Sequence, residues 1–253
     1  MGPVLKAVSF DLWGTLFDLG RERGKDKARC RNLLAVLHDA GLSGPSQQDL
    51  LEAQRLMEES GTRRRRTQGR DMTPEEQLFR ILEKLQLDVD RVVFDRLLEA
   101  YCTVSLAIPP EPAPGAREVL AELSRTYDLT LICNTGTTPG WVLRPLLDQA
   151  CLLPYLKSPV FSNEVGFAKP HPLIYRRALE GLGGLQPCEV VHVGDDPLYD
   201  VAGPHGLGMR TVWLDHGTEE DRPPADAVVF QLRDVPMALE RLAHARTAAA
   251  QAW

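Results

Sequence analysis

The sequence predicts an α/β protein with a doubly wound parallel sheet and an inserted α-helical domain. From Ala116 onward, helical patterns alternate with short β-branched runs, which is typical of parallel strands joined by helices. Before that point, roughly ninety residues keep a helical pattern, a length that fits a small inserted domain better than a loop. We therefore expect a sheet domain formed by residues 1–18 and 112–253, and a helical cap domain formed by residues 19–111.

The predicted sheet begins with the apolar run Ala7–Phe10, a buried strand that stops at Asp11. Helical periodicity then predicts helices over residues 29–40, 47–59, 74–85 and 92–106 of the insertion. The third helix starts at residues 73–76, Thr-Pro-Glu-Glu, which have the pattern of a capping box with proline at the first helical position. The proline-rich residues 108–115 cannot continue a helix and therefore end the insertion.

The rest of the chain supplies the other elements of the predicted sheet domain. Strands are expected at residues 129–133, 159–162, 190–193, 210–214 and 227–230. Helices are expected at residues 116–127, 141–147, 173–182 and 236–247, with a short helix ending near residue 205.

Composition narrows the classes of function. A net charge of −6 argues against a nucleic-acid binder with a basic face, and we expect the four arginines at residues 63–66 to be solvated surface. No stretch of about 18 apolar residues is present and no leader precedes the first strand, so we expect a cytoplasmic protein without a membrane partner. The five cysteines form no Cys-x-x-Cys pair and are expected to be reduced. Nothing in the sequence specifies an oligomeric state.

Chemically reactive side chains follow the predicted strands. In a doubly wound sheet, ligands bind in the loops after the strands, however far apart these loops lie in sequence. The loops contain Asp11 and Thr15, then Asn134 and Thr135, then Lys169, and finally Asp195, Asp196 and Asp200. Taken singly, Asp196 or Asp200 is typical of a helix cap, and a lone lysine is typical of a protein surface. Their order along one alternating scaffold favours a shared site.

In this order the residues resemble the four motifs of the haloacid-dehalogenase-like hydrolase superfamily, which has a Rossmann-like core. The segments 164–172 and 193–203 are similar to the family's usual motif sequences, and residues 19–111 resemble its inserted cap in position. The resemblance implies that Asp11 attacks the substrate and forms an aspartyl-enzyme ester, which water then hydrolyses. It also implies that Lys169 neutralises charge, and that Thr15, Asn134 and Thr135 hold substrate oxygens.

The same resemblance implies a Mg²⁺ cofactor in the phosphatase members. The ligands would be Asp11, the backbone carbonyl of Trp13 and Asp195, with Asp196 or Asp200 reaching the metal or its waters. Oxygen ligands and water are what Mg²⁺ prefers. Because a backbone carbonyl does not depend on side-chain identity, Trp13 leaves metal binding feasible.

Two positions depart from the family pattern. Trp13 stands where the phosphatases have a second aspartate, which protonates the leaving oxygen and activates water, so this proton transfer is lost. Trp13 is expected either to line an apolar pocket or to stack on an aromatic substrate. Cys133 stands where the second motif has Ser or Thr, and without an adjacent base we expect a structural thiol there.

Three functions stay open on these residues. The leading prediction is a Mg²⁺-dependent phosphatase of a small phosphorylated metabolite, because the acidic residues 195, 196 and 200 have no obvious use without a cation. The second is a metal-free 2-haloacid dehalogenase, since those enzymes also have an aromatic residue at the position of Trp13 and halide leaves without a proton. The third is a binding protein that keeps the scaffold but has lost efficient turnover.

Overall fold

The computed structural model describes residues 4–18, 20, 24–217 and 223–250. Within them, six parallel strands form one sheet in the order β3-β2-β1-β4-β5-β6. The strands are β1 (Ala7–Phe10), β2 (Asp128–Cys133), β3 (Val160–Phe161), β4 (Val190–Gly194), β5 (Arg210–Leu214) and β6 (Ala227–Val229). The predicted α/β class is therefore confirmed, and each predicted strand is found within two residues of its expected bounds.

Strand β1 lies at the point where the strand order reverses. The chain passes from β1 to β2 and β3 on one side, and then returns to β4 on the other side. Ser9 of β1 pairs with Thr130 of β2 and with His192 of β4, so the three strands end at the same edge of the sheet. An open α/β sheet binds ligands at such a switch point, because adjacent loops diverge there and leave a crevice.

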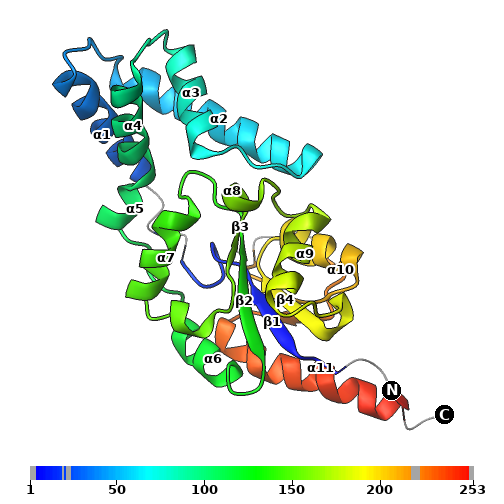
Figure 1. The fold of residues 1–253 in the computed structure, drawn as a ribbon. Coiled ribbons are helices and arrows are strands. Elements are labelled where there is room, and N and C mark those ends of the chain that lie inside the picture. Colours follow the sequence, from blue (N-terminus) through cyan, green and yellow to red (C-terminus); the bar gives the residue numbers. More distant parts are fainter. Residues whose placement is uncertain (1–3, 19, 21–23, 218–222, 251–253) are drawn as a thin grey trace.

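Helices cover both faces of the sheet (Figure 1). One face carries α9 and α10, which pack against β2, β3 and β5, and the other carries α6 and α11. Each face buries its own apolar cluster, one of which continues into the inserted helices. The bounds are α6 (Ala116–Leu123), α7 (Gly140–Gln149), α8 (Ser162–Val165), α9 (Pro172–Gly181), α10 (Gly203–Leu207) and α11 (Val235–Ala250).

Between β1 and α6, the described residues form five α-helices, which we call the inserted helices: α1 (Lys25–Asp39), α2 (Gln47–Gln68), α3 (Pro74–Lys84), α4 (Arg91–Cys102) and α5 (Val104–Ala107). In Figure 1, α1 to α4 lie beyond the carboxyl ends of the strands, above the sheet. No helix among the described residues is both long and apolar enough to cross a bilayer.

The largest difference between the observed and predicted helix bounds is in α2, which continues to Gln68 instead of stopping at residue 59. A glycine inside a helix costs roughly 1 kcal/mol, but Gly61 is buried where α2 packs. Ion pairs of Arg64 with Glu76 and of Arg65 with Asp71 hold the extension against its neighbour. The arginine run is therefore only partly the solvated surface that composition predicts.

The predicted capping box of α3 is half present. The Thr73 side chain accepts a hydrogen bond from the Glu76 backbone N–H, as expected for an N-cap. The Glu76 carboxylate does not complete the box among the described hydrogen bonds, because it binds Arg64 and Arg80 instead. The fourth predicted helix is also divided, with α4 ending at Cys102 and α5 beginning at Val104.

Candidate active site

Lys169 lies between two carboxylates that come from different parts of the chain. Its Nζ atom is 2.5 Å from Asp11 Oδ1 and 2.6 Å from Asp200 Oδ1. Asp11 directly follows β1, Lys169 precedes α9, and Asp200 lies in the π-helical turn η4 (Pro197–Ala202) after β4. Lys169 is 1% exposed and Asp200 is fully buried, and such groups are rarely buried unless paired. The structure therefore unites three of the residues that the sequence singled out.

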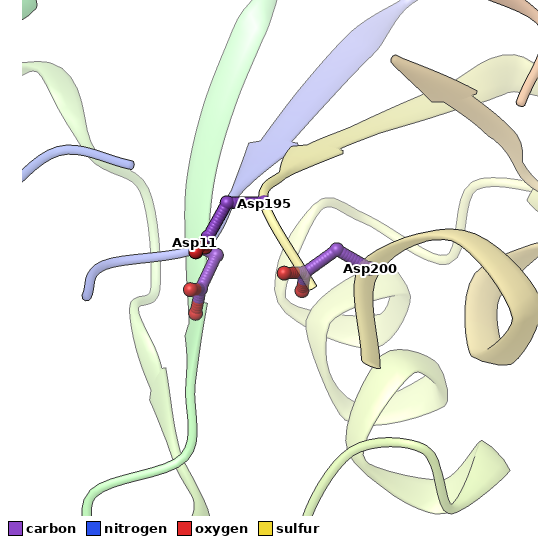
Figure 2. Close-up of side chains that lie close together, drawn as sticks. All are labelled: Asp11, Asp195 and Asp200. Carbon is purple, nitrogen blue, oxygen red and sulfur yellow. The ribbon is translucent and has the colours of Figure 1, made fainter. Parts of the chain in front are cut away.

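A cluster of three carboxylates forms the centre of the site. Oxygen atoms of Asp11, Asp195 and Asp200 all lie within 4.8 Å of one another, and Figure 2 shows these side chains together at the strand ends. A donor set made only of carboxylate oxygens suits a hard cation such as Mg²⁺. One lysine ammonium faces three carboxylates, so the residues present fit a site that a divalent cation would neutralise.

The pKa values of these carboxyl groups reflect the concentration of negative charge. Burial raises the pKa of Asp11 well above its usual value, and the charges of Asp200 and Asp195 raise it further, in opposition to Lys169. Burial, together with the charge of Asp200, raises the pKa of Asp195 to about 7. Asp11 and Asp195 therefore bind protons more tightly than ordinary aspartates do. A bound cation would lower both pKa values and favour the charged carboxylates.

Asp200 shows the opposite behaviour. Burial alone would raise its pKa, but the Lys169 ammonium and a hydrogen bond from His192 hold the pKa of this carboxyl well below its usual value. Lys169 in turn has a raised pKa, because the attraction of Asp11 and Asp200 outweighs the effect of its burial. Asp200 and Lys169 therefore form a charged pair at neutral pH, and the helix-cap interpretation of Asp200 does not apply.

Asn134 lies beside Lys169 and binds its backbone on both sides. Its Oδ1 accepts from the Lys169 N–H at 2.8 Å, and its Nδ2 donates to the Lys169 carbonyl at 3.1 Å. Both polar atoms of the side chain are thus engaged with the main chain. In this arrangement Asn134 orients the lysine loop, whereas the resemblance implied that it contacts substrate.

Thr135 is also engaged within the protein. Its backbone N–H donates to Ser162 Oγ at 2.9 Å, and its hydroxyl lies 3.1 Å from the same atom. Ser162 donates to the carboxylate of Asp71, which lies between α2 and α3. The loop after β2 is therefore tied to the inserted helices through a buried serine that the sequence gave no reason to select.

Thr15 and Gly14 adjoin Asp195. The Thr15 hydroxyl is fully buried and lies 3.4 Å from Asp195 Oδ1, a long hydrogen bond. Gly14 has a φ of +83°, and a Cβ at this position would overlap the Asp195 carboxylate. The turn after β1 therefore needs glycine both for its left-handed backbone and for the approach of Asp195.

Asp196 serves as a helix cap. Its Oδ1 accepts from the backbone N–H groups of Leu198 and Tyr199, each at 2.8 Å, at the start of η4. Its own N–H donates to Asp200 Oδ2 at 3.0 Å. The carboxylate is not a member of the cluster of three, so this residue fits the structural interpretation given for a lone aspartate.

Trp13 and Cys133, the two positions that depart from the family pattern, contact different parts of the protein. The half-buried Trp13 ring packs against Phe17 at 6.0 Å between centroids, and the Lys25 ammonium lies 5.4 Å from its centre. Cys133 is fully buried, and burial raises the pKa of its thiol well above the usual value. This environment keeps the thiol neutral and agrees with the expected structural role.

The inserted helices reach the loops of the sheet through further polar contacts. Arg29 of α1 donates to Thr137 Oγ1 at 3.0 Å, and Gln77 of α3 donates to the Gly136 carbonyl at 3.1 Å. The Gly69 carbonyl accepts from the N–H of Ala168, next to Lys169. These residues, like Ser9 and His192 behind Asp200, are absent from the set selected by sequence. The available signal was weak: Ser9 and His192 are polar residues within otherwise apolar strands.

A family model for haloacid dehalogenase-like hydrolases matches residues 5–208 of the chain. A phosphoserine phosphatase from Thermus thermophilus is 38% identical over 127 residues, which are 49% of this chain and 50% of that protein. A glyceraldehyde 3-phosphate phosphatase from Methanothermobacter thermautotrophicus is 30% identical over 222 residues, which are 87% of this chain and 90% of that protein. The chain spans about half the length of the first curated relatives that it matches.

Solved structures share the fold at low sequence identity. A 2-haloacid dehalogenase from Pseudomonas syringae aligns with a TM-score of 0.68 and 24% identity, covering 94% of this chain and 100% of that one. A phosphatase from Thermococcus onnurineus aligns with a TM-score of 0.64 and 23% identity, covering 93% of this chain and 98% of that one. At this identity the likeness concerns the fold, which phosphatases and dehalogenases have in common.

Proposed function

Because the chain belongs to the haloacid dehalogenase-like hydrolases, we propose that it is a Mg²⁺-dependent phosphatase that uses Asp11 as its nucleophile. The observation that supports this choice is the cluster of Asp11, Asp195 and Asp200, with Lys169 bound to Asp11 and Asp200. A dehalogenase that needs no metal would gain nothing from three carboxylates at such close range, and their repulsion would cost stability. The relatives named as phosphatases point to the same activity.

In the proposed reaction, a carboxylate oxygen of Asp11 forms a bond to phosphorus while the bond from phosphorus to the leaving oxygen breaks. Water then attacks the aspartyl phosphate and releases inorganic phosphate, which regenerates the carboxylate. Lys169 binds Asp11 Oδ1 and would balance charge on the nucleophile. Thr15 lies at the same edge, while Asn134 and Thr135 would position the lysine loop and the loop after β2.

Mg²⁺ would be held by Asp11, Asp195 and Asp200, with the Trp13 carbonyl as a further oxygen ligand, and it would supply electrostatic stabilisation of the phosphoryl group. Asp196 is a weaker candidate for a Mg²⁺ ligand than these three aspartates, because one of its carboxylate oxygens caps η4. An oxygen-only donor set is consistent with this metal.

The substrate class follows from Trp13. An indole cannot protonate a departing alkoxide, so we propose that the substrate carries a good leaving group, as aryl phosphates and acyl phosphates do. We further propose that residues 19–111 act as a cap over a small phosphorylated molecule, that residues 1–18 and 112–253 form the catalytic core, and that the protein works in the cytoplasm.

The test is a substrate panel measured with Mg²⁺ and again with chelator. The panel contains p-nitrophenyl phosphate, acetyl phosphate, glycerol 3-phosphate and 2-chloropropionate. We expect phosphate release from the first two, abolished by chelator and by Asp11→Asn, and little release from the alkyl ester. Phosphate release that is indifferent to chelator would contradict the metal assignment.

Two other outcomes would favour the alternatives. Chloride release from 2-chloropropionate in chelator would support the metal-free dehalogenase, whose one favourable feature here is the aromatic residue at Trp13. A single burst of p-nitrophenol equal to the enzyme concentration, without further turnover, would indicate a trapped aspartyl phosphate. That result would support a protein that binds its ligand but has lost efficient hydrolysis.

A further inference from the structure

A chain of buried polar groups continues behind the catalytic lysine. His192 Nε2 lies 3.0 Å from Asp200 Oδ1, and His192 Nδ1 lies 2.8 Å from the hydroxyl of Ser9. Ser9, His192 and Asp200 are all fully buried. Since β1 and β4 are paired so that Ser9 faces His192, the sheet register itself fixes this contact. The chain thus runs from Ser9 through His192, Asp200 and Lys169 to Asp11.

The positions of the protons in this chain follow from the acceptors. The Asp200 carboxylate already accepts from the Lys169 ammonium at Oδ1 and from the Asp196 N–H at Oδ2, and an ionised carboxylate only accepts hydrogen bonds. His192 must therefore carry its proton on Nε2 to bind Asp200. In a neutral ring, a proton on Nε2 leaves Nδ1 as the acceptor. The Ser9 hydroxyl satisfies this acceptor, being 2.8 Å from Nδ1 but 3.4 Å from the Val191 carbonyl.

Three donors then fix the Asp200 carboxylate from different directions. Oδ1 accepts from Lys169 and His192, and Oδ2 accepts from the Asp196 backbone N–H. Tyr175 packs edge-on against the imidazole at 6.0 Å between centroids, which restrains the ring plane. Burying an imidazole in a strand costs free energy that a valine or leucine would not, so the value of His192 lies in its hydrogen bonds.

We propose that His192 is a positioning residue for the catalytic centre, which uses its Nε2–H to hold Asp200 and thereby keeps Lys169 against Asp11. This inference rests on the proposed phosphatase function. Ser9 supports it because its hydroxyl lies 2.8 Å from Nδ1, closer than its 3.4 Å contact with the Val191 carbonyl, and a donor at Nδ1 favours the tautomer that can bind Asp200. Neither residue contacts the reacting atoms, so both act through the orientation of Asp200 and Lys169.

Two variants of His192 separate the hydrogen bond from the volume of the side chain. His192→Phe keeps a buried ring but removes both hydrogen bonds, whereas His192→Gln keeps an N–H group at a position equivalent to Nε2. With p-nitrophenyl phosphate and Mg²⁺, we expect His192→Phe to lower kcat at least about 30-fold with KM changed less than about threefold. His192→Gln should recover kcat to within about fivefold of wild type, and Ser9→Ala should lower kcat only about threefold, since the Nε2–H remains.

A purely structural role predicts a different result. The melting temperature of His192→Phe would fall, but the folded protein would keep its kcat, and Gln would rescue no better than Phe. Equal kcat values for the Phe and Gln variants, when both are folded by circular dichroism, would overturn the proposal. Loss of kcat in Phe with recovery in Gln supports it.

A measurement that needs no turnover keeps this inference separate from the proposed function. Nitrogen NMR of ¹⁵N-histidine-labelled protein should show His192 protonated on Nε2 at pH 7. A ring that lacks a proton on Nε2 would overturn the proposal even in an active enzyme. If no member of the substrate panel is hydrolysed, the phosphatase assignment fails, and the NMR spectrum alone then decides whether His192 holds Asp200.

Discussion

The hydroxyl of Ser162 donates to the carboxylate of Asp71 across 2.5 Å, and this hydrogen bond connects the inserted helices with the sheet. Asp71 also accepts from Arg65 at 2.9 Å, and Ser162 also accepts from the N–H of Thr135 at 2.9 Å. The Asp71 side chain is almost fully buried. A displacement of the connection between α2 and α3 would therefore be transmitted to the loop after β2, beside the proposed catalytic centre.

We expect Asp71→Ala and Ser162→Ala each to lower the free energy of unfolding by about 1–3 kcal/mol, because each leaves a buried polar partner unsatisfied. The double variant should lose less than the sum, with a coupling of about 0.5–3 kcal/mol measured by urea denaturation. Asp95→Ala, which removes an exposed ion pair with Arg91, is the control and should change stability by less than about 0.5 kcal/mol. Fully additive effects of the two single changes would mean that this hydrogen bond contributes nothing.

Gly14 offers a test of how closely the first turn must approach Asp195. Gly14→Ala introduces a Cβ that overlaps the Asp195 carboxylate, in addition to the strain of a left-handed backbone, which costs about 1–2 kcal/mol. We expect lower stability and Mg²⁺ affinity reduced at least about tenfold by calorimetry, because the carboxylate must move.

Gly136→Ala is the matched control for this change. Gly136 also has a positive φ, of +56°, but a Cβ there meets nothing within 4 Å. Gly136→Ala should lower the free energy of unfolding, because of the strained backbone, but it should keep the wild-type Mg²⁺ affinity. Equal metal affinities for the two alanine variants would contradict a role for Gly14 in seating Asp195.

The raised pKa of Asp195, about 7 in the metal-free fold compared with its ordinary value of 3.8, predicts a specific pH dependence of stability. Between these two values the folded protein binds this proton more tightly than the unfolded chain does. The free energy of unfolding in chelator should therefore fall as pH rises from about 4 to about 7. The stabilisation produced by Mg²⁺ should grow over the same window, because the metal binds the ionised form.

Denaturation at several pH values, with chelator and with Mg²⁺, measures this dependence. Asp195→Asn should reduce the slope in chelator, since it removes one of the two carboxyl groups whose pKa is raised in the fold, Asp11 being the other. Asp196→Asn should retain the slope, because asparagine also caps helices well and Asp196 is not part of the carboxylate cluster. A slope unchanged by Asp195→Asn would assign the pH dependence to other groups.

Trp13→Asp tests whether the rest of the centre is competent for general acid catalysis. A carboxyl group at this position could protonate a departing alkoxide, and we expect the rate with glycerol 3-phosphate to rise about 10²-fold or more. Trp13→Asn opens the same space without an acid and should leave that rate at the wild-type level. If Asp and Asn variants hydrolyse the alkyl ester equally, the missing proton donor is not what limits this reaction.

Local signals in the sequence were sufficient for the elements of the fold. Alternation of β-branched runs with helices predicted the parallel sheet, and the proline-rich residues 108–115 separate α5 from α6, as expected of residues that cannot continue a helix. The predicted end of α2 was wrong, because its last turns are held by ion pairs of Arg64 and Arg65 with residues beyond the helix itself. Where an element depends on its own caps and periodicity it can be predicted, and where it depends on a packed neighbour it cannot.

The sequence by itself determined which kinds of side chain stand at the strand ends, because a strand followed by a carboxylate or an amide is a local pattern. Only the tertiary structure decided what each of them touches. Asn134 turned out to hold the backbone of Lys169, Thr135 to bind Ser162, and Ser9 with His192 to support Asp200. The physical reason is that a hydrogen bond depends on the distance and direction between two groups, and for residues far apart in the chain the strand register and the packing of the inserted helices set both.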